Sequence, residues 1–133
     1  MTTAGPTAPG ALPATTGTAL DLDQLLGIWH ATDQHTPGVT RLELTGTDGV
    51  LVISARGADE PQPRDWGTAE ATAYGADPGS DKAMAFTASY DFGFLTILLA
   101  AYAKQGILVL DTFTSFHDGT GRSDYFTREF FHR

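Results

Sequence analysis

The stretch LLGIWHATD, Leu25 to Asp33, separates two parts of the chain that differ in composition. Before it, residues 1–18 are mainly Thr, Ala, Pro and Gly and offer no side chains for a core, so we expect a flexible leader there. After it, segments rich in Val, Ile, Thr, Phe and Tyr alternate with turn residues at intervals of roughly 10–15 residues, which is typical of antiparallel all-β domains. With 133 residues, the chain fits one domain, which we place at 19–133.

A short segment rich in leucine and aspartate comes directly before this stretch. Asp21 is a suitable N-cap and Gly27 a natural stop signal for a helix. The pattern predicts a short N-terminal helical turn whose leucines pack on the segments that follow.

Eight strand-like segments follow, and the turns between them are short. Asp48-Gly49 is a strong hairpin signal. The segment 93–105 is ambiguous, because its leucines also fit helical spacing, and we favour the strand. The expected strands are 28–33, 39–45, 50–55, 66–74, 83–92, 95–103, 107–116 and 123–131.

Eight hairpin-linked strands, with no room for crossover helices, predict an eight-stranded antiparallel up-and-down β-barrel. Closure into a barrel removes the exposed edges that a long meander would otherwise leave. A barrel of eight strands is either filled by side chains or holds one small ligand.

The composition excludes several classes of partner. The formal net charge is −8, which argues against nucleic acid and against anionic membrane surfaces. The chain has no cysteine, a basic n-region and an apolar h-region are missing from its N-terminus, and no apolar run is long enough for a membrane helix. We expect a cytoplasmic protein, and the abundance of Ala, Thr, Gly and Asp suggests a bacterial one.

With a Gly-x-Trp at the start of its first strand, the expected barrel resembles the calycins, a group that includes lipocalins, avidins and fatty-acid-binding proteins. In those families the indole closes one end of the barrel and packs against a basic side chain near the end of the last strand. The resemblance implies that Trp29 is a barrel plug with Arg128 or Arg133 as its partner, and we favour Arg128. An arginine over an indole face is also a favourable cation–π pair.

One charged residue interrupts the most hydrophobic strand. Asp111 shares a face with Ile107, Val109 and Phe113, and if that face is interior, the carboxylate is buried and suited to acid–base work. We therefore name Asp111 as the catalytic candidate.

Aromatic residues are the best candidates for contact with a ligand inside the barrel, since tyrosine combines an apolar ring with a polar tip. No histidine pair has metal-ligand spacing, so we expect no metal and no cofactor, and His117 is the one histidine to check for a haem-type role. The expected ligand-binding residues are Trp29, Phe86, Tyr90, Tyr102, Phe113 and Tyr125.

Three functions stay open at this point. The first is a lipocalin-like protein that binds one small, mostly apolar molecule. The second is a cofactor-free cyclase or isomerase of a natural-product intermediate in secondary metabolism, similar to allene oxide cyclase-like barrels, which act by orienting the substrate and excluding water. The third is a filled barrel that serves as an interaction module, and a homodimer is compatible with all three.

Overall fold

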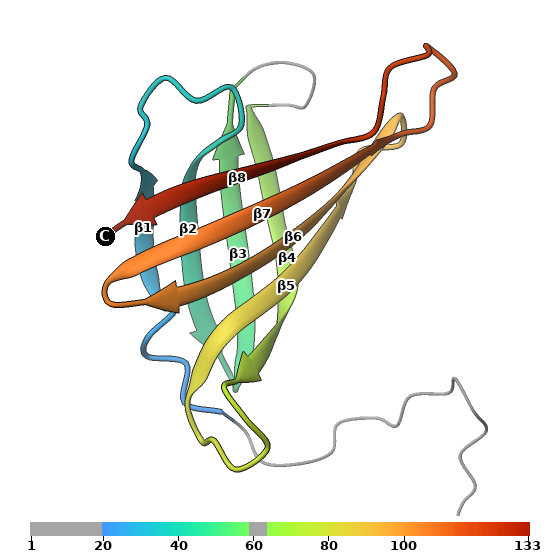
Figure 1. Cartoon of the computed structure of the whole chain (residues 1–133). Coiled ribbons are helices and arrows are strands. Elements are labelled where there is room, and N and C mark those ends of the chain that lie inside the picture. The colour runs from blue at the N-terminus through green and yellow to red at the C-terminus, as the bar shows by residue number, and fades with distance from the viewer. Residues whose placement is uncertain (1–19, 59–63) are drawn as a thin grey trace, which may run out of the picture.

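The computed structural model describes residues 20–58 and 64–133, and these form one closed antiparallel β-barrel (Figure 1). Each strand pairs with the next along the chain, and the last strand returns to the first. The predicted leader, residues 1–18, lies outside the described residues. The strands are β1 Gly27–Ala31, β2 Val39–Thr47, β3 Val50–Gly57, β4 Asp65–Gly75, β5 Ala83–Asp91, β6 Leu95–Lys104, β7 Ile107–Phe116 and β8 Tyr125–His132.

Alternation along the strands fills the barrel. On β2, for example, Leu42 and Leu44 are fully buried, whereas Arg41 and Glu43 between them are partly exposed. The same period of two places large apolar side chains in one continuous core. The largest fully buried side chains are Trp29, Phe86, Phe131, Leu25, Leu42, Leu44, Leu51, Ile53, Leu95, Ile97, Leu99 and Leu108.

Two hairpin turns confirm the turn chemistry. Asp48 and Gly49 have φ of 52° and 78°, and Gln105 and Gly106 have φ of 54° and 81°. Two successive residues with positive φ match the twist of the flanking strands. The Gln105–Gly106 turn links β6 to β7, so the ambiguous segment 93–105 is mostly strand, as favoured.

The meander gives the barrel two different ends. At the loop end lie the connections 32–38, 92–94 and 117–124, together with the end of β3 and the start of β4; β6, β7 and β8 extend past this rim (Figure 1). At the opposite, plugged end, the segment before β1 crosses the opening. Its Asp21 N–H donates to Asp81 O at 2.8 Å, and Ala83 N–H donates to Asp21 O at 2.8 Å.

This crossing segment is a single hydrogen-bonded turn rather than a longer helix. Leu25 N–H and Leu26 N–H both donate to Leu22 O, and the Asp21 carboxylate accepts the Asp23 N–H at 2.9 Å, as an N-cap does. Leu25 is fully buried in the core, so the turn packs as the sequence predicts. No helix in the described ranges has the length and apolar character needed to cross a membrane.

The plug itself is built around Trp29. The indole N–H donates to Leu25 O at 2.9 Å, and the Arg133 guanidinium lies 4.4 Å from the ring centroid. Arg133 also donates to Leu26 O at 2.7 Å. Gly27 has φ of 122°, and a Cβ there would lie 3.2 Å from the Arg133 side chain, so the glycine is needed for both reasons.

The prediction that Arg128 is the partner of the Trp29 plug was wrong. Trp29 and Phe131 point inward, and β8 alternates, so Arg128 points outward, where it pairs with Asp111. Arg133 is the arginine with the right parity and position at the plugged end.

The barrel closes on a short seam. β1 pairs with β8 only at His30 with His132 and at Ala31 with Phe131, and the Thr32 N–H adds one bond to Phe130 O at 2.8 Å. Beyond this point the chain leaves β8, so the barrel wall is interrupted on the side of the loop end.

We predict that Trp29→Ala lowers the free energy of unfolding by about 3–5 kcal/mol, because a fully buried indole leaves a large cavity when it is removed. Urea denaturation monitored by circular dichroism measures the loss. A loss below about 1 kcal/mol would contradict a structural plug.

A matched arginine pair tests the cation–π contact. Arg133→Met should lower the free energy of unfolding by about 0.5–2 kcal/mol, because it removes the contact with Trp29 and the bond to Leu26 O. Arg128→Met removes an exposed ion pair and should cost less. Equal losses in the two variants would show that Arg133 has no special role in the plug.

Candidate functional site

The structure divides the predicted site residues between the two sides of the barrel wall. Phe86 and Tyr90 are buried inside, as expected. Tyr125 is on the inner side of β8 but lies at the rim, where it is 40% exposed and stacks on Phe116. Trp29 points inward and closes the plugged end.

Tyr102 and Phe113 were placed on the wrong side. Both point outward, from β6 and β7, and both are exposed. Alternation shows which residues of a strand share a face, but it does not show which face is inside. The outer face of β6 and β7 is also apolar, so hydrophobicity does not distinguish the two faces. Neither side chain contacts the interior.

The catalytic candidate Asp111 was wrong for the same reason. Its carboxylate lies on the outer face and accepts two hydrogen bonds from Arg128, at 2.7 and 2.9 Å. The hydrogen bond from Arg128 holds the pKa of Asp111 below its usual range, so the group stays ionised at neutral pH. A carboxylate that points outward, is paired and is ionised is not suited to proton transfer inside the barrel.

The inward-facing carboxylate is instead Glu129. It follows Thr127 and precedes Phe131 on the inner face of β8, and it lies beside the interrupted seam. A hollow of about 350 Å³ opens there. Its lining residues are Ala31, Thr32, Asp33, Thr36, Pro37, Gly38, Thr127, Arg128, Glu129 and Phe130.

Glu129 binds the chain that leaves the seam. Its carboxylate accepts a hydrogen bond from the Thr36 hydroxyl and another from the Val39 N–H, at 3.1 Å. A Cβ at position 38 would overlap the Glu129 carboxylate, so Gly38 leaves the space in which that group sits. The side chain therefore ties the β1–β2 connection to β8 where backbone pairing has ended.

Burial raises the pKa of Glu129, and the hydrogen bonds from Thr36 and Val39 oppose that shift only in part. Nearby Asp33 raises it further. A carboxyl group with a raised pKa, beside a hollow, is the kind of group that can donate or accept a proton. The sequence carries one signal for this position, because Glu129 is two residues from Phe131 and so shares its face of the strand.

Two buried polar groups have no hydrogen-bond partner in the described parts of the chain. They are the indole N–H of Trp66, on β4, and the hydroxyl of Thr112, on β7. Both residues are more than nine-tenths buried. An unpaired buried donor costs roughly 1–3 kcal/mol, so such groups call for an explanation.

Both groups belong to the same region as Glu129. Thr112 points inward and pairs with Thr127, which is two residues before Glu129 on the same face. The Trp66 N–H lies against Gly57, where an added Cβ would be 3.1 Å from it and 3.1 Å from Gly38 O. The half of the barrel near the loop end thus contains a carboxyl group and two unused donors.

Aromatic rings form the wall around Trp66. Its ring meets Tyr90 and Phe92 edge-on, with centroids 5.4 and 5.9 Å away, and those two rings stack on each other. The Tyr90 hydroxyl donates to Gly67 O at 3.0 Å, and burial raises the pKa of Tyr90 to about 12. Tyr90 is therefore a fixed, neutral part of the wall, and its hydroxyl is already used.

Small side chains line the inner side of β4. Ala69, Ala71 and Ala73 point inward, opposite Ile53, Leu51 and Phe86 on the neighbouring strands, yet all three remain partly exposed. These alanines pack against the core and give the inner side of β4 a low profile.

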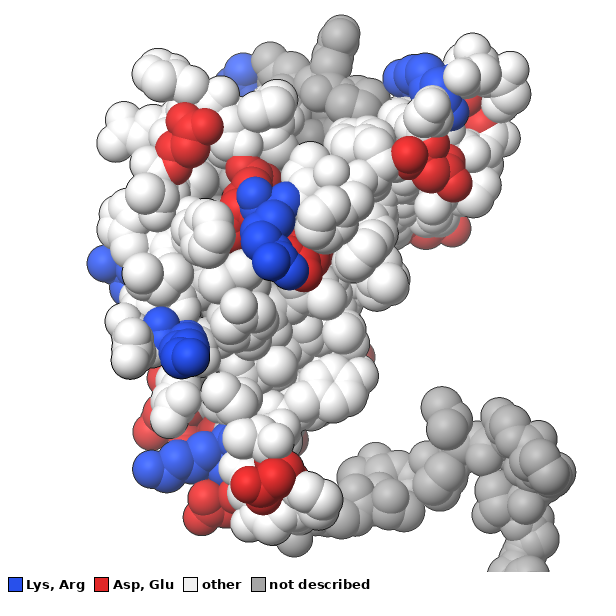
Figure 2. Space-filling view, in the orientation of Figure 1, with Lys and Arg blue, Asp and Glu red and all other residues white. Residues whose placement is uncertain are grey.

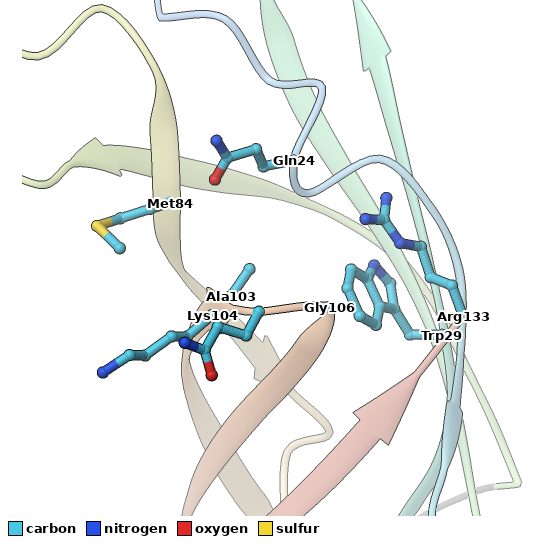
Figure 3. Close-up of a pocket in the computed structure, with 8 residues that line it drawn as sticks. Gln24, Trp29, Met84, Ala103, Lys104, Gly106 and Arg133 are labelled. Carbon is cyan, nitrogen blue, oxygen red and sulfur yellow. The ribbon is translucent and has the colours of Figure 1, made fainter.

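A second hollow, of about 380 Å³, lies at the plugged end (Figure 3). There Arg133 lies beside the Trp29 ring, while Met84 and Lys104 lie on the other side of the opening. The indole N–H and one face of the ring are already used by Leu25 and Arg133. This hollow is a surface depression next to the plug, and it offers no unused buried donor from Trp29.

Metal-binding chemistry finds no support among the residues that the structure describes, where no cluster of three His, Cys, Asp or Glu occurs. His117 is exposed, and its Nε2 lies 2.9 Å from the hydroxyl of outward-facing Thr96. It does not point into the barrel as a haem ligand would.

Comparison with protein-family models, with curated proteins and with solved structures found no match to this chain. The class that the fold defines is the closed eight-stranded antiparallel β-barrel. The site must therefore be interpreted from its own chemistry.

We predict a specific pH dependence for Glu129. Because its pKa is higher in the folded than in the unfolded chain, the folded state binds more protons between the two pKa values, and stability falls as the pH rises through that window. The window begins near the ordinary glutamate pKa, about 4.3, and ends at the raised value. In Glu129→Gln this part of the fall should be missing.

Urea denaturation of both proteins from about pH 4 to pH 8 measures the difference. Glu43→Gln, on the outer side of β2, is the matched control and should follow the wild-type curve. Parallel curves for wild type and Glu129→Gln would contradict the burial of the Glu129 carboxyl.

Proposed function

We propose that this protein binds one small, mostly apolar molecule inside the half of the barrel near the loop end, in the manner of lipocalin-like calycins. The observation that carries the proposal is a pair of buried donors, Trp66 N–H and Thr112 O–H, that have no partner among residues 20–58 and 64–133 and lie in a largely apolar interior. A filled barrel gains nothing from such groups, whereas a bound oxygen atom would satisfy them.

The chemistry of the wall defines the ligand. Aromatic rings and alanines favour an apolar body, and the two donors favour carbonyl or ether oxygens on it. Glu129 adds a group that prefers a neutral or donor-bearing ligand over an anion. The hollow at the seam is the route by which such a molecule reaches the interior in this proposal.

Binding of Nile red, a neutral apolar dye with a carbonyl acceptor, tests the site by fluorescence titration. Thr112→Val removes the unpaired hydroxyl at nearly constant volume, so we expect binding that is about 2–10-fold weaker together with a fold that is more stable by about 1 kcal/mol. Trp66→Phe should weaken binding as well.

Thr72→Val, on the outer side of β4, is the matched control and should bind as the wild type does. Leu98→Asp, on the outer side of β6 and away from the seam hollow, separates binding at the outer face from binding inside, because it should leave the interior signal unchanged. Unchanged affinity in Thr112→Val and in Trp66→Phe would contradict the proposed site.

Glu129 favours a second function for the same site, a cofactor-free cyclase or isomerase acting on a bacterial natural-product, polyketide-like intermediate. A partly buried carboxyl group beside a hollow can move a proton, and the barrel orients the substrate and excludes water. Native mass spectrometry of the protein from its own source identifies the molecule to test. Turnover that falls at least about 100-fold in Glu129→Gln, with binding retained, would establish the enzyme. Retained turnover would exclude Glu129 as the acid or base.

A further inference from the structure

The outer face of β6, β7 and β8 is unusually apolar. Six large side chains point outward from these strands and are between 41% and 51% exposed. We call this surface the β6–β8 face. Its exposed apolar residues are Leu98, Tyr102, Ile107, Phe113, Phe126 and Phe130.

Strand register arranges these residues in rows across the sheet. Leu98, Phe113 and Phe126 form one row, and the rings of the two phenylalanines lie 5.2 Å apart. Tyr102, Val109 and Phe130 form another row. Between the two apolar rows lies a third, which contains the ion pair Asp111–Arg128.

The face differs in charge from the rest of the protein. The whole chain has a net charge of −8, yet Asp111 is the one carboxylate among the outward-facing residues of these three fully described strands, and Arg128 balances it. Figure 2, which looks onto this side, shows mostly uncharged surface with blue and red atoms in contact near its centre. Two copies of such an acidic chain repel each other least where they meet through a surface with few carboxylates, and on this one Lys104 also points outward, at the end of β6.

The exposed area also suits an interface. A large aromatic side chain carries roughly 150–250 Å², so the four half-exposed rings alone present about 300–500 Å². With the two aliphatic side chains, the exposed apolar area of the face reaches about 600 Å². That is the upper end of the range for the largest apolar patch on a typical monomer. That matches the apolar share of a standard interface, which buries about 800 Å² on each partner.

We propose that the β6–β8 face is the interface of a homodimer in which two copies pack these sheets against each other about a two-fold axis. An axis that runs along the strands between β7 and β8 places Asp111 of one copy opposite Arg128 of the other. The same axis places Phe113 opposite Phe126 and Val109 opposite Phe130. The face is therefore complementary to itself in charge and in apolar character, as a two-fold interface requires.

Sedimentation velocity over about three decades of concentration, around a dissociation constant of 1 µM, tests this proposal. We expect the wild type to be dimeric at the upper end of the series. Phe130→Asp should weaken the dimer by at least about 100-fold, because it puts a charge into the apolar row. Tyr74→Asp, which changes an aromatic residue of similar exposure on β4, should leave the dimer intact.

Cross-linking provides a second test that does not depend on a disruptive variant. Because the chain has no cysteine, copies carrying Phe113→Cys can be mixed with copies carrying Phe126→Cys and treated with a short bis-maleimide cross-linker, which spans the distance of about 10 Å between packed sheets. We expect a cross-linked mixed dimer, and none when Tyr74→Cys replaces either variant. A wild type that stays monomeric throughout the series, or a dimer that survives Phe130→Asp and forms no mixed cross-link, would overturn the proposal. A monomer would leave the face to a different protein partner.

Discussion

The seam between β1 and β8 is the constraint on which the other features depend. The barrel closes through only two residue pairs, so backbone hydrogen bonds alone secure little of this junction. Side chains complete it on both sides. At the plugged end, Arg133 joins Trp29 and the turn before β1, and toward the loop end Glu129 binds Thr36 and Val39.

The two side-chain bridges have different consequences. The Trp29–Arg133 contact is a cation–π pair that is fully buried on the tryptophan side, and the indole N–H is bonded to Leu25 O, so it adds stability without leaving an unused polar group on Trp29. Glu129 adds a carboxyl group to the inner wall, where burial opposes its ionisation. Where the pairing of β1 with β8 ends, the Glu129 side chain replaces the missing backbone hydrogen bonds. The incomplete seam thus places a carboxyl group with a raised pKa on the inner wall.

Most of the fold could be predicted from the sequence because alternation and turn residues act locally. Asp48-Gly49 set one hairpin, and the expected strands agree with the observed ones. The sequence could not show which face of each strand lies inside the barrel and which lies outside. Ile107, Val109, Asp111 and Phe113 do share a face, but that face is outside, because the outer surface of β7 is apolar as well.

The same ambiguity explains the site residues that the sequence missed. Glu129 directly follows Arg128 on β8, and two adjacent charged residues suggest a strand with solvent on both of its faces. Only Arg128 points outward to solvent, whereas Glu129 points inward. Trp66 and Thr112 became informative only once their burial and lack of partners were visible. Whether a buried polar group has a hydrogen-bond partner depends on the contacts of the folded chain. The spacing of residues in the sequence does not predict it.

The indole N–H signals of the two tryptophans offer the most direct test of binding inside the barrel. Trp29 donates to Leu25 O, whereas the Trp66 donor has no partner within the described part of the chain. We would record these signals by ¹H–¹⁵N NMR for protein from its own source, before and after unfolding and refolding to remove bound molecules. The account predicts that the Trp66 signal moves and the Trp29 signal does not. A Trp66 signal that stays in place, in protein shown by mass spectrometry to have carried a small molecule, would contradict it.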